Sequence, residues 1–191
     1  MIRAEGHLGG YVYDDIEYGT YCTEVWDWLI NECKVRSMVD IGCGLGHTLK
    51  YFGARGCDVL GIDGSVSAIE DNEVPGSVRR HDYTKDKLVI DKAYDMIWSA
   101  EFVEHVEEKY IANFMETFKA ASKYILITHA TPGQGGYHHV NEQPRDYWLD
   151  KFSEIGFAED VLLTNITKDM LPPERGWYYK NNGIFLVRNA T

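Results

Sequence analysis

A glycine-rich turn at residues 39–46 constrains this chain more than any other feature of its sequence. The run Val-Asp-Ile-Gly-Cys-Gly-Leu-Gly ends the apolar stretch 37–41 and precedes a helical pattern at 48–54. Glycine tolerates left-handed backbone and lets the main chain approach a ligand closely, so the pattern predicts a strand-to-helix turn that binds a small molecule. The spacing is G-x-G-x-G, and His47 stands where a dinucleotide-binding turn has its third glycine. Asp40, two residues before the first glycine, suits a ligand with a cationic amino group better than a diphosphate.

Strand and helix patterns alternate along most of the chain. Short apolar runs bounded by turn residues predict strands, and apolar residues at helical spacing predict helices. This alternation predicts a parallel sheet covered by helices on both faces. The last two strands lack a helical pattern between them, which favours a hairpin-like antiparallel end to the sheet. The predicted strands are 37–41, 58–63, 78–82, 94–98, 124–128, 161–164 and 184–188, and the helices are 22–33, 48–54, 67–72, 102–118 and 145–154.

The organisation predicted from the sequence is a single domain over residues 1–191. The length suits one hydrophobic core, and no repeat or linker interrupts the chain. The first part, about 1–35, consists of an aromatic arm followed by a helix. Its tyrosines and glycines predict an ordered segment, because disordered segments are poor in aromatic residues. Residues 11–21 either close over a pocket as a lid or pack against the sheet, and the sequence leaves both open.

The composition excludes several classes of partner. A formal net charge of −11 disfavours nucleic acid and anionic membrane surfaces, which require basic patches. No run approaches the roughly 20 apolar residues of a membrane span, and the N-terminus lacks the pattern of a signal peptide. The four cysteines form no C-x-x-C pair, so we expect reduced thiols. Together these features predict a cytoplasmic protein.

Two further acids fall where predicted strands end. Asp63 closes the second strand and is followed by Gly64, and Asp82 closes the third and is followed by Tyr83. The carboxyl ends of the strands form the crevice in which α/β sheets bind ligands. The spacing of Asp63 from the glycine turn is close to that at which an acid binds ribose hydroxyls. Helix capping or bonding within a loop is the alternative role for both acids.

In combination, these motifs resemble those of the class I S-adenosylmethionine-dependent methyltransferase family, over roughly residues 36–160. The resemblance implies a Rossmann-like three-layer sandwich, with a mostly parallel seven-stranded sheet and an antiparallel last strand. The segment 101–106, Glu-Phe-Val-Glu-His-Val, is similar to one common in small-molecule members. The other matching segments are 40–46 (first motif), 61–65 (second motif), 81–83 (adenine-binding acid), 94–99 (fourth strand) and 139–157 (an H-x-N…G-F ending).

The resemblance also implies a cofactor and the residues that hold it. The cofactor would be S-adenosyl-L-methionine, with S-adenosyl-L-homocysteine as its product. Asp63 would hold the ribose, Asp82 the adenine amino group, and the glycine turn together with the main chain near Ser99 the methionine half. The implied cofactor-binding residues are Asp40, Gly42, Gly44, Gly46, Asp63, Gly64, Asp82, Tyr83 and Ser99.

Candidate catalytic residues lie after the fourth and fifth predicted strands. Glu101 and His105 follow the fourth strand, and His139 lies in the glycine-rich loop 131–144 after the fifth. Histidine titrates near neutral pH and can take the proton of a hydroxyl acceptor, and we favour His139 for this role. A purely structural, hydrogen-bonded role stays open for each histidine.

The predicted function is O-methylation of a small polar metabolite. No metal is predicted, because a site built from His138, His139 and Glu142 would need adjacent side chains to point the same way. Two alternatives stay open: a non-catalytic S-adenosylmethionine-binding module, and a nicotinamide-dependent oxidoreductase, which His47 disfavours. The sequence leaves the acceptor molecule and the oligomeric state undetermined.

Overall fold

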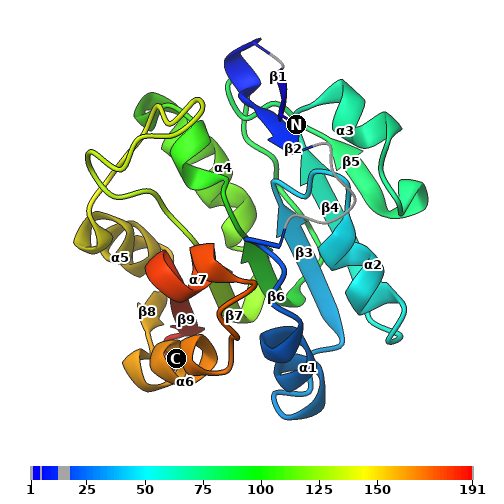
Figure 1. The fold of residues 1–191 in the computed structure, drawn as a ribbon, viewed down its shortest axis with the longest axis vertical. Coiled ribbons are helices and arrows are strands. Elements are labelled where there is room, and N and C mark those ends of the chain that lie inside the picture. Colours follow the sequence, from blue (N-terminus) through cyan, green and yellow to red (C-terminus); the bar gives the residue numbers. More distant parts are fainter. Residues whose placement is uncertain (1, 5, 13–17, 191) are drawn as a thin grey trace.

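A seven-stranded sheet forms the centre of the molecule in the computed structural model, which describes residues 2–4, 6–12 and 18–190 (Figure 1). In spatial order its strands are β5 (Val78–Arg80), β4 (Asp58–Asp63), β3 (Ser37–Ile41), β6 (Tyr94–Ser99), β7 (Ala121–Ile127), β9 (Ile184–Arg188) and β8 (Phe157–Glu159). The five strands from β5 to β7 run parallel, β9 is antiparallel to β7, and β8 is antiparallel to β9. This arrangement confirms the predicted α/β class and its antiparallel end.

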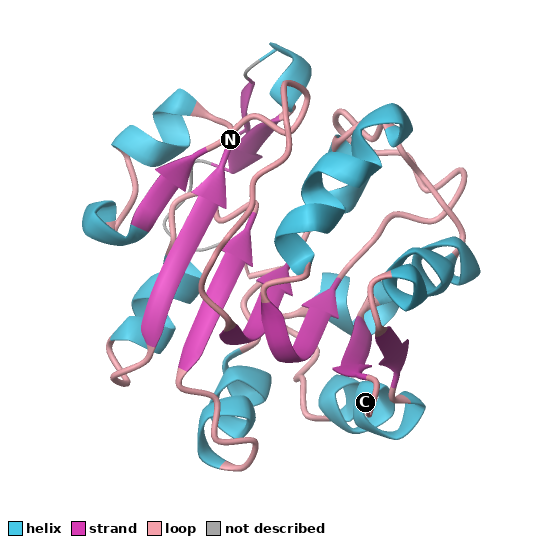
Figure 2. Cartoon of the chain, turned by 180° about the vertical axis from the view of Figure 1, so that it is seen from behind, coloured by secondary structure: helices cyan, strands magenta, loops and turns pink. Residues whose placement is uncertain are grey.

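Helices cover both faces of the sheet (Figures 1 and 2). They are α1 (Thr23–Asn31), α2 (His47–Gly53), α3 (Val66–Glu70), α4 (Ile111–Phe118), α5 (Arg145–Glu154), α6 (Val161–Asp169) and α7 (Trp177–Asn182). Successive residues of a strand point to opposite faces, so Met96 and Trp98 of β6 join one core cluster and Ile97 joins the other. The cluster with Met96 and Trp98 packs under α1, α2, α6 and α7. The cluster with Ile97 packs under α4 and α5. The predicted three-layer sandwich is therefore present.

The N-terminal arm forms a small structure of its own above the sheet. β1 (Ile2–Ala4) pairs antiparallel with β2 (Gly10–Val12), and the 3-10 turn η1 (Gly6–Leu8) joins them. Figure 1 shows this unit near the carboxyl end of β4. Residues 13–17 of the arm lie outside the described residues. Gly19 packs against Tyr178, where an added Cβ would lie 2.2 Å from the ring, so the described end of the arm contacts α7.

The helix predicted over residues 102–118 is only half present. Its second half is α4, and its first half forms two 3-10 turns, η3 (Val103–His105) and η4 (Glu108–Tyr110). The carbonyl of Glu104 accepts hydrogen bonds from the backbone N–H groups of Val140 and Asn141, at 3.0 and 3.1 Å. That carbonyl is thus turned to a distant loop instead of the next helical turn, which prevents a continuous helix.

The strand predicted at residues 161–164 is wrong, because these residues begin α6. The edge strand β8 lies just before them. Asp160 caps the helix by accepting a hydrogen bond from the backbone N–H of Leu163, at 2.9 Å. The apolar run suggested a buried strand, yet Leu162 is 68% exposed. Because α6 and α7 separate β8 from β9, the antiparallel pair is not a hairpin.

Two further predictions concern thiols and membranes. All four cysteines are free thiols, as predicted. Within the described ranges, no helix has the length and apolar character needed to cross a bilayer.

Candidate active site

The glycine turn after β3 has the strained geometry that only glycine adopts readily. Gly42 has a φ of 80°, in the left-handed region. A Cβ at this position would lie 2.9 Å from the Cβ of Phe102, so a larger residue would collide with the segment after β6. The backbone N–H groups of Gly42 and Cys43 both donate to the carbonyl of Ile62, at 2.8 and 3.2 Å, which ties the turn to β4.

A buried asparagine holds the second half of the turn. Asn72 donates from Nδ2 to the carbonyl of Gly44 at 2.8 Å. Gly46, with a φ of 82°, is the N-terminal cap of α2, and a Cβ there would lie 2.5 Å from Oδ1 of Asn72. Asn72 is therefore a positioning residue for the turn. No local motif links Asn72 to the glycines, so its role could not be predicted from the sequence.

A cavity of about 360 Å³ opens at the carboxyl ends of β3, β4 and β6. The described lining residues include four acids, Asp40, Asp63, Asp82 and Glu101. No Lys or Arg is among the described residues that line the cavity. The cavity is therefore acidic and favours a cationic ligand over a phosphate. Its remaining walls come from the arm (His7, Leu8, Gly10 and Thr20), the loop after β7 (Gln134, Gly135, Gly136, Tyr137 and His139) and Tyr178 of α7.

Asp63 lies at the end of β4 and braces the turn from the side. Its Oδ2 accepts a hydrogen bond from the N–H of Gly44, and its Oδ1 accepts one from the N–H of Ser65, both at 2.9 Å. A carboxylate has about four acceptor positions, so these two bonds leave capacity for a ligand in the cavity.

Asp82, in the loop after β5, contacts the arm. Its Oδ1 accepts hydrogen bonds from the backbone N–H and the hydroxyl of Thr84, at 2.9 and 2.7 Å, and its Oδ2 lies 2.9 Å from Nε2 of His7. Partial burial would raise the pKa of Asp82, but the bonds from Thr84 and His7 outweigh that effect and lower it. Asp82 is thus ionised at neutral pH. Beside it, Leu8 lies against Gly64, where an added Cβ would be 2.9 Å away.

Asp40 is a buried acid under the turn, and only 3% of its surface is exposed. Burial raises its pKa to about 7, a hydrogen bond with Thr48 opposes the shift, and the nearby charge of Asp63 adds to it. Burying a carboxyl group costs free energy, so this position points to a binding role.

Another wall of the cavity begins at Glu101, just after β6. Its φ of 53° is unusual for a residue with a side chain. Thr128, just after β7, secures it twice: the N–H of Glu101 donates to the threonine hydroxyl at 2.8 Å, and this hydroxyl donates to Oε1 of Glu101 at 3.1 Å. The strained backbone thus aims the Glu101 carboxylate at a defined position.

His105 is held neutral beside two other histidines. Its Nδ1 lies 3.1 Å from the carbonyl of His138, so Nδ1 carries the proton and donates to it. Burial, with a smaller contribution from His139, lowers the pKa of His105 to about 4. The rings of His105 and His139 meet edge to face, with centroids 5.1 Å apart.

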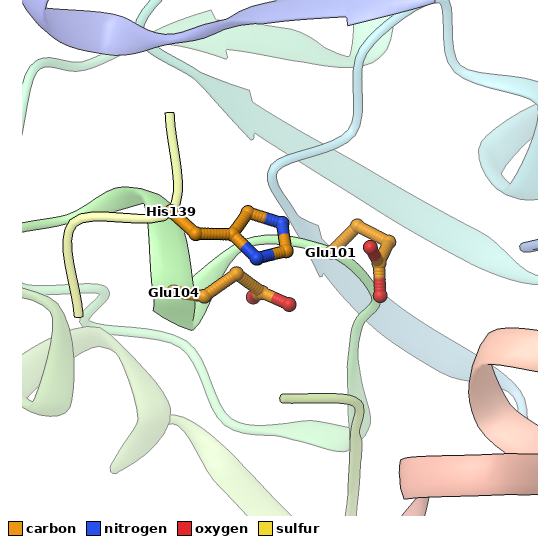
Figure 3. Close-up of side chains that lie close together, drawn as sticks. All are labelled: Glu101, Glu104 and His139. Carbon is orange, nitrogen blue, oxygen red and sulfur yellow. The ribbon is translucent and has the colours of Figure 1, made fainter. Parts of the chain in front are cut away.

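Glu101, Glu104 and His139 converge in one cluster, which Figure 3 shows from the side. Their ligand atoms all lie within 4.8 Å of one another. Glu104 is fully buried, and its carboxyl oxygens have no hydrogen-bond partner among the described residues. Burial, followed by the charge of Glu101, raises the pKa of Glu104 well above its usual range.

The structure brings together most of the predicted site residues. Gly46 and Ser99 are not among the described lining residues: Gly46 caps α2, and the Ser99 hydroxyl donates to the carbonyl of Ile41 at 2.9 Å. Glu104 lies in the motif at residues 101–106, but nothing in the sequence indicates that its side chain is buried. The predicted residues that line the cavity are Asp40, Gly42, Gly44, Asp63, Gly64, Asp82, Tyr83, Glu101, His105 and His139.

Several lining residues were absent from the sequence prediction. Trp98 lies at the end of β6, Tyr137 in the loop after β7 and Tyr178 in α7. The aromatic arm was a candidate lid, and Thr20 within it does line the cavity. These residues are far apart in the sequence, so no motif spacing connects them. They come together at the cavity only when the chain folds.

Comparison with known proteins finds a family match and several relatives. A family model described as "Methyltransferase domain" matches residues 23–162, more than half of the chain. The ubiquinone biosynthesis O-methyltransferase of Rickettsia conorii is 30% identical over 105 residues. The match covers 51% of this chain but only 36% of the relative, so the chain spans well under half of that protein's length.

Solved structures share the fold at low sequence identity. The magnesium protoporphyrin IX methyltransferase of Synechocystis, solved with bound S-adenosylmethionine, has a TM-score of 0.63 at 15% identity, over 88% of this chain and 78% of that one. A sugar N-methyltransferase from a Streptoalloteichus species has a TM-score of 0.64 at 13% identity, over 94% and 97%. With the family match over most of the chain, these findings lead to one assignment. The chain belongs to the class I S-adenosylmethionine-dependent methyltransferase family.

Proposed function

We propose that this protein transfers a methyl group from S-adenosylmethionine to an oxygen atom of a small polar acceptor. The observation that carries the proposal is the acidic cavity over the glycine turn, whose described walls hold four acids and no Lys or Arg. S-adenosylmethionine is cationic at its sulfonium and amino groups and has no phosphate. A nicotinamide dinucleotide has two phosphates, which the ionised carboxyl groups of this lining would repel.

The residues present fit this cofactor. The cavity volume of about 360 Å³ lies in the range of small-molecule pockets. Asp40 and the Gly42–Gly44 turn would hold the amino-acid half, Asp63 the ribose hydroxyls, and Asp82 with Tyr83 the adenine. When bound, the cofactor supplies a methyl group that its positive sulfur has already activated.

The chain's own residues would align the acceptor and keep out water. Glu101, His105 and His139 line the cavity, and their polar atoms would orient a hydroxyl group. The arm and the loop after β7 cover the cavity. Bonds such as that between His7 and Asp82 would keep the arm in place.

Two observations support an oxygen acceptor of small size. The curated relatives with the matching segment are named O-methyltransferases. The cavity is bounded by the arm, a loop and α7 instead of an open basic groove. The alternative of a non-catalytic binding module is disfavoured by Glu101, His105 and His139, since cofactor binding by the turn would not require them.

Isothermal calorimetry tests the cofactor assignment. S-adenosylmethionine should bind, and NAD should not. Asp63→Ala should cost about 1.5–3 kcal/mol of affinity, as expected for lost charge-assisted hydrogen bonds. Asp58→Ala is the matched control, because Asp58 stands at the exposed start of the same strand and pairs with Lys92. Binding of NAD alone, or equal affinity in folded Asp63→Ala, would refute the assignment.

The acceptor class has its own test. Metabolite pools incubated with the protein and methyl-labelled cofactor should yield a labelled small molecule whose new methyl group is on oxygen. Label confined to protein or nucleic acid, or found on nitrogen or carbon, would contradict the proposed acceptor.

A further inference from the structure

The cluster of Glu101, Glu104 and His139 contains a buried carboxyl group that the methyl-transfer proposal does not use. Glu104 has no exposed surface, and neither of its carboxyl oxygens has a hydrogen-bond partner among the described residues. Burying a carboxyl group without a hydrogen-bond partner costs free energy. Two carboxyl groups this close stay ionised together only if a cation compensates their charge, and otherwise one of them takes up a proton. The described lining of the adjoining cavity supplies no Lys or Arg.

The geometry of the three side chains matches that of metal ligands. Their ligand atoms lie within 4.8 Å of one another (Figure 3). Ligand bonds of about 2.0–2.2 Å place donors on one ion up to about 4 Å apart, so the cluster needs only a small closure. The backbone bonds from Val140 and Asn141 to Glu104 hold the loop of His139 beside the glutamates.

The imidazole of His139 lies beside a third carboxylate, without an aligned hydrogen bond to it. Its Nδ1 lies 3.4 Å from Oε1 of Glu142. The carboxylate of Glu142 is itself fixed by the N–H groups of Gly133 and Gly135, both at 2.7 Å. A metal-binding histidine commonly directs its other ring nitrogen to such a carboxylate, which leaves the second nitrogen for the metal.

We propose that Glu101, Glu104 and His139 bind one divalent transition-metal cation, for which Mn²⁺ is the representative ion. Two carboxylates suit Mn²⁺, and the imidazole favours it, Co²⁺ or Zn²⁺ over Ca²⁺. Three protein ligands leave open positions on the ion. Because Glu101 and His139 line the cavity whereas Glu104 lies behind them, these open positions face the cavity.

The cation would activate the hydroxyl group of the methyl acceptor, and this step rests on the proposed function. A hydroxyl group bound to a divalent cation loses its proton to water more readily. Its oxygen then forms the bond to the methyl carbon, while the carbon–sulfur bond breaks and its electron pair stays on sulfur. His139 would be a metal ligand and not the general base predicted from the sequence, and the prediction of no metal would be wrong.

Titration with Mn²⁺ alone tests the site without cofactor or substrate. The protein is stripped with a chelator, and the electron paramagnetic resonance signal of free Mn²⁺ is followed as protein is added. The wild type should bind one ion per chain. Glu104→Gln and His139→Gln should each weaken binding by about tenfold or more. Glu107→Gln, an exposed acid on the same segment that pairs with Lys109, should bind like the wild type.

Thermal unfolding separates lost binding from lost folding. Without metal, Glu104→Gln should be at least as stable as the wild type, because a neutral amide replaces a buried carboxyl group. Mn²⁺ should raise the melting temperature of the wild type and not of this variant. Failure of the wild type to bind Mn²⁺, Co²⁺ or Zn²⁺, or unchanged binding in both variants, would overturn the site. The proposed function would fail separately, through absent binding of S-adenosylmethionine in calorimetry.

Discussion

Burial of the Asp40 carboxyl group lowers the stability of the unliganded fold at neutral pH and above, and places an acid where it can bind a cationic ligand. The pKa of this carboxyl group is raised from 3.8 to about 7. In the unfolded chain the group ionises near pH 4, whereas in the fold it resists ionisation until about pH 7. Stability contributed by the neutral form is therefore complete below about pH 4 and lost as the pH rises through 7. A cationic ligand would compensate for this cost.

Asp40→Asn should make the unliganded protein more stable at pH 8, by roughly 3–4 kcal/mol. The gain should disappear as the pH falls from 7 to 4, because Asp40 of the wild type then becomes neutral. The measurement is urea unfolding at several pH values. The same variant should bind S-adenosylmethionine less tightly at pH 8. A variant that is no more stable at pH 8 would show that burial does not penalise this carboxyl group.

At the scale of elements, the loop after β7 is built around His139. Gly136 has a φ of 153°, and an added Cβ would lie 2.4 Å from Cε1 of the His139 ring. Glycine at this point lets the ring lie against the loop backbone. The position of a candidate metal ligand thus depends on a residue that offers no functional group.

Gly136→Ala should displace His139, lower Mn²⁺ affinity and methyl transfer, and leave S-adenosylmethionine affinity unchanged. Gly133→Ala is the matched control, since Gly133 lies in the same loop with a φ of 82° but has nothing within 4 Å of an added Cβ. Both variants carry backbone strain, and only the first carries the collision. Manganese resonance and calorimetry measure the two affinities, and equal Mn²⁺ binding by both variants would argue against a role for the His139 position.

At the scale of the whole molecule, the cavity is where separate segments of the chain meet. Its lining reaches from His7 in the arm to Tyr178 in α7, and includes the ends of three strands. A ligand bound there would contact several of these segments at once. Binding should therefore stabilise the fold as a unit.

S-adenosylmethionine at about 100 times its dissociation constant should add roughly 2.7 kcal/mol to the free energy of unfolding. For a domain of this size, each kcal/mol raises the melting temperature by about 2–4 °C, so the expected rise is about 5–10 °C. Differential scanning calorimetry measures it. NAD at the same concentration is the control, and an equal rise with NAD would favour the oxidoreductase alternative over the methyltransferase.

Local sequence patterns were enough to predict several elements and part of the binding chemistry. β3, β4, β9 and α5 have their predicted bounds, because burial imposes a readable periodicity on short segments. The glycine turn was recognisable because its left-handed backbone demands particular residues at particular positions. The acids at the ends of β3 and β4 followed from the same local signals.

Features that depend on contacts between distant segments could not be predicted from local patterns. The bonds of Val140 and Asn141 to Glu104 interrupt the predicted helix and bring His139 to Glu101 and Glu104. Asn72 supports the glycine turn from a position that no motif marks. Residues 161–164 begin a helix whose buried Thr164 hydroxyl accepts a hydrogen bond from the N–H of Phe185, at 3.0 Å, whereas the apolar Leu162 stays exposed. These hydrogen bonds join residues far apart in the sequence, and such contacts exist only after the chain has folded.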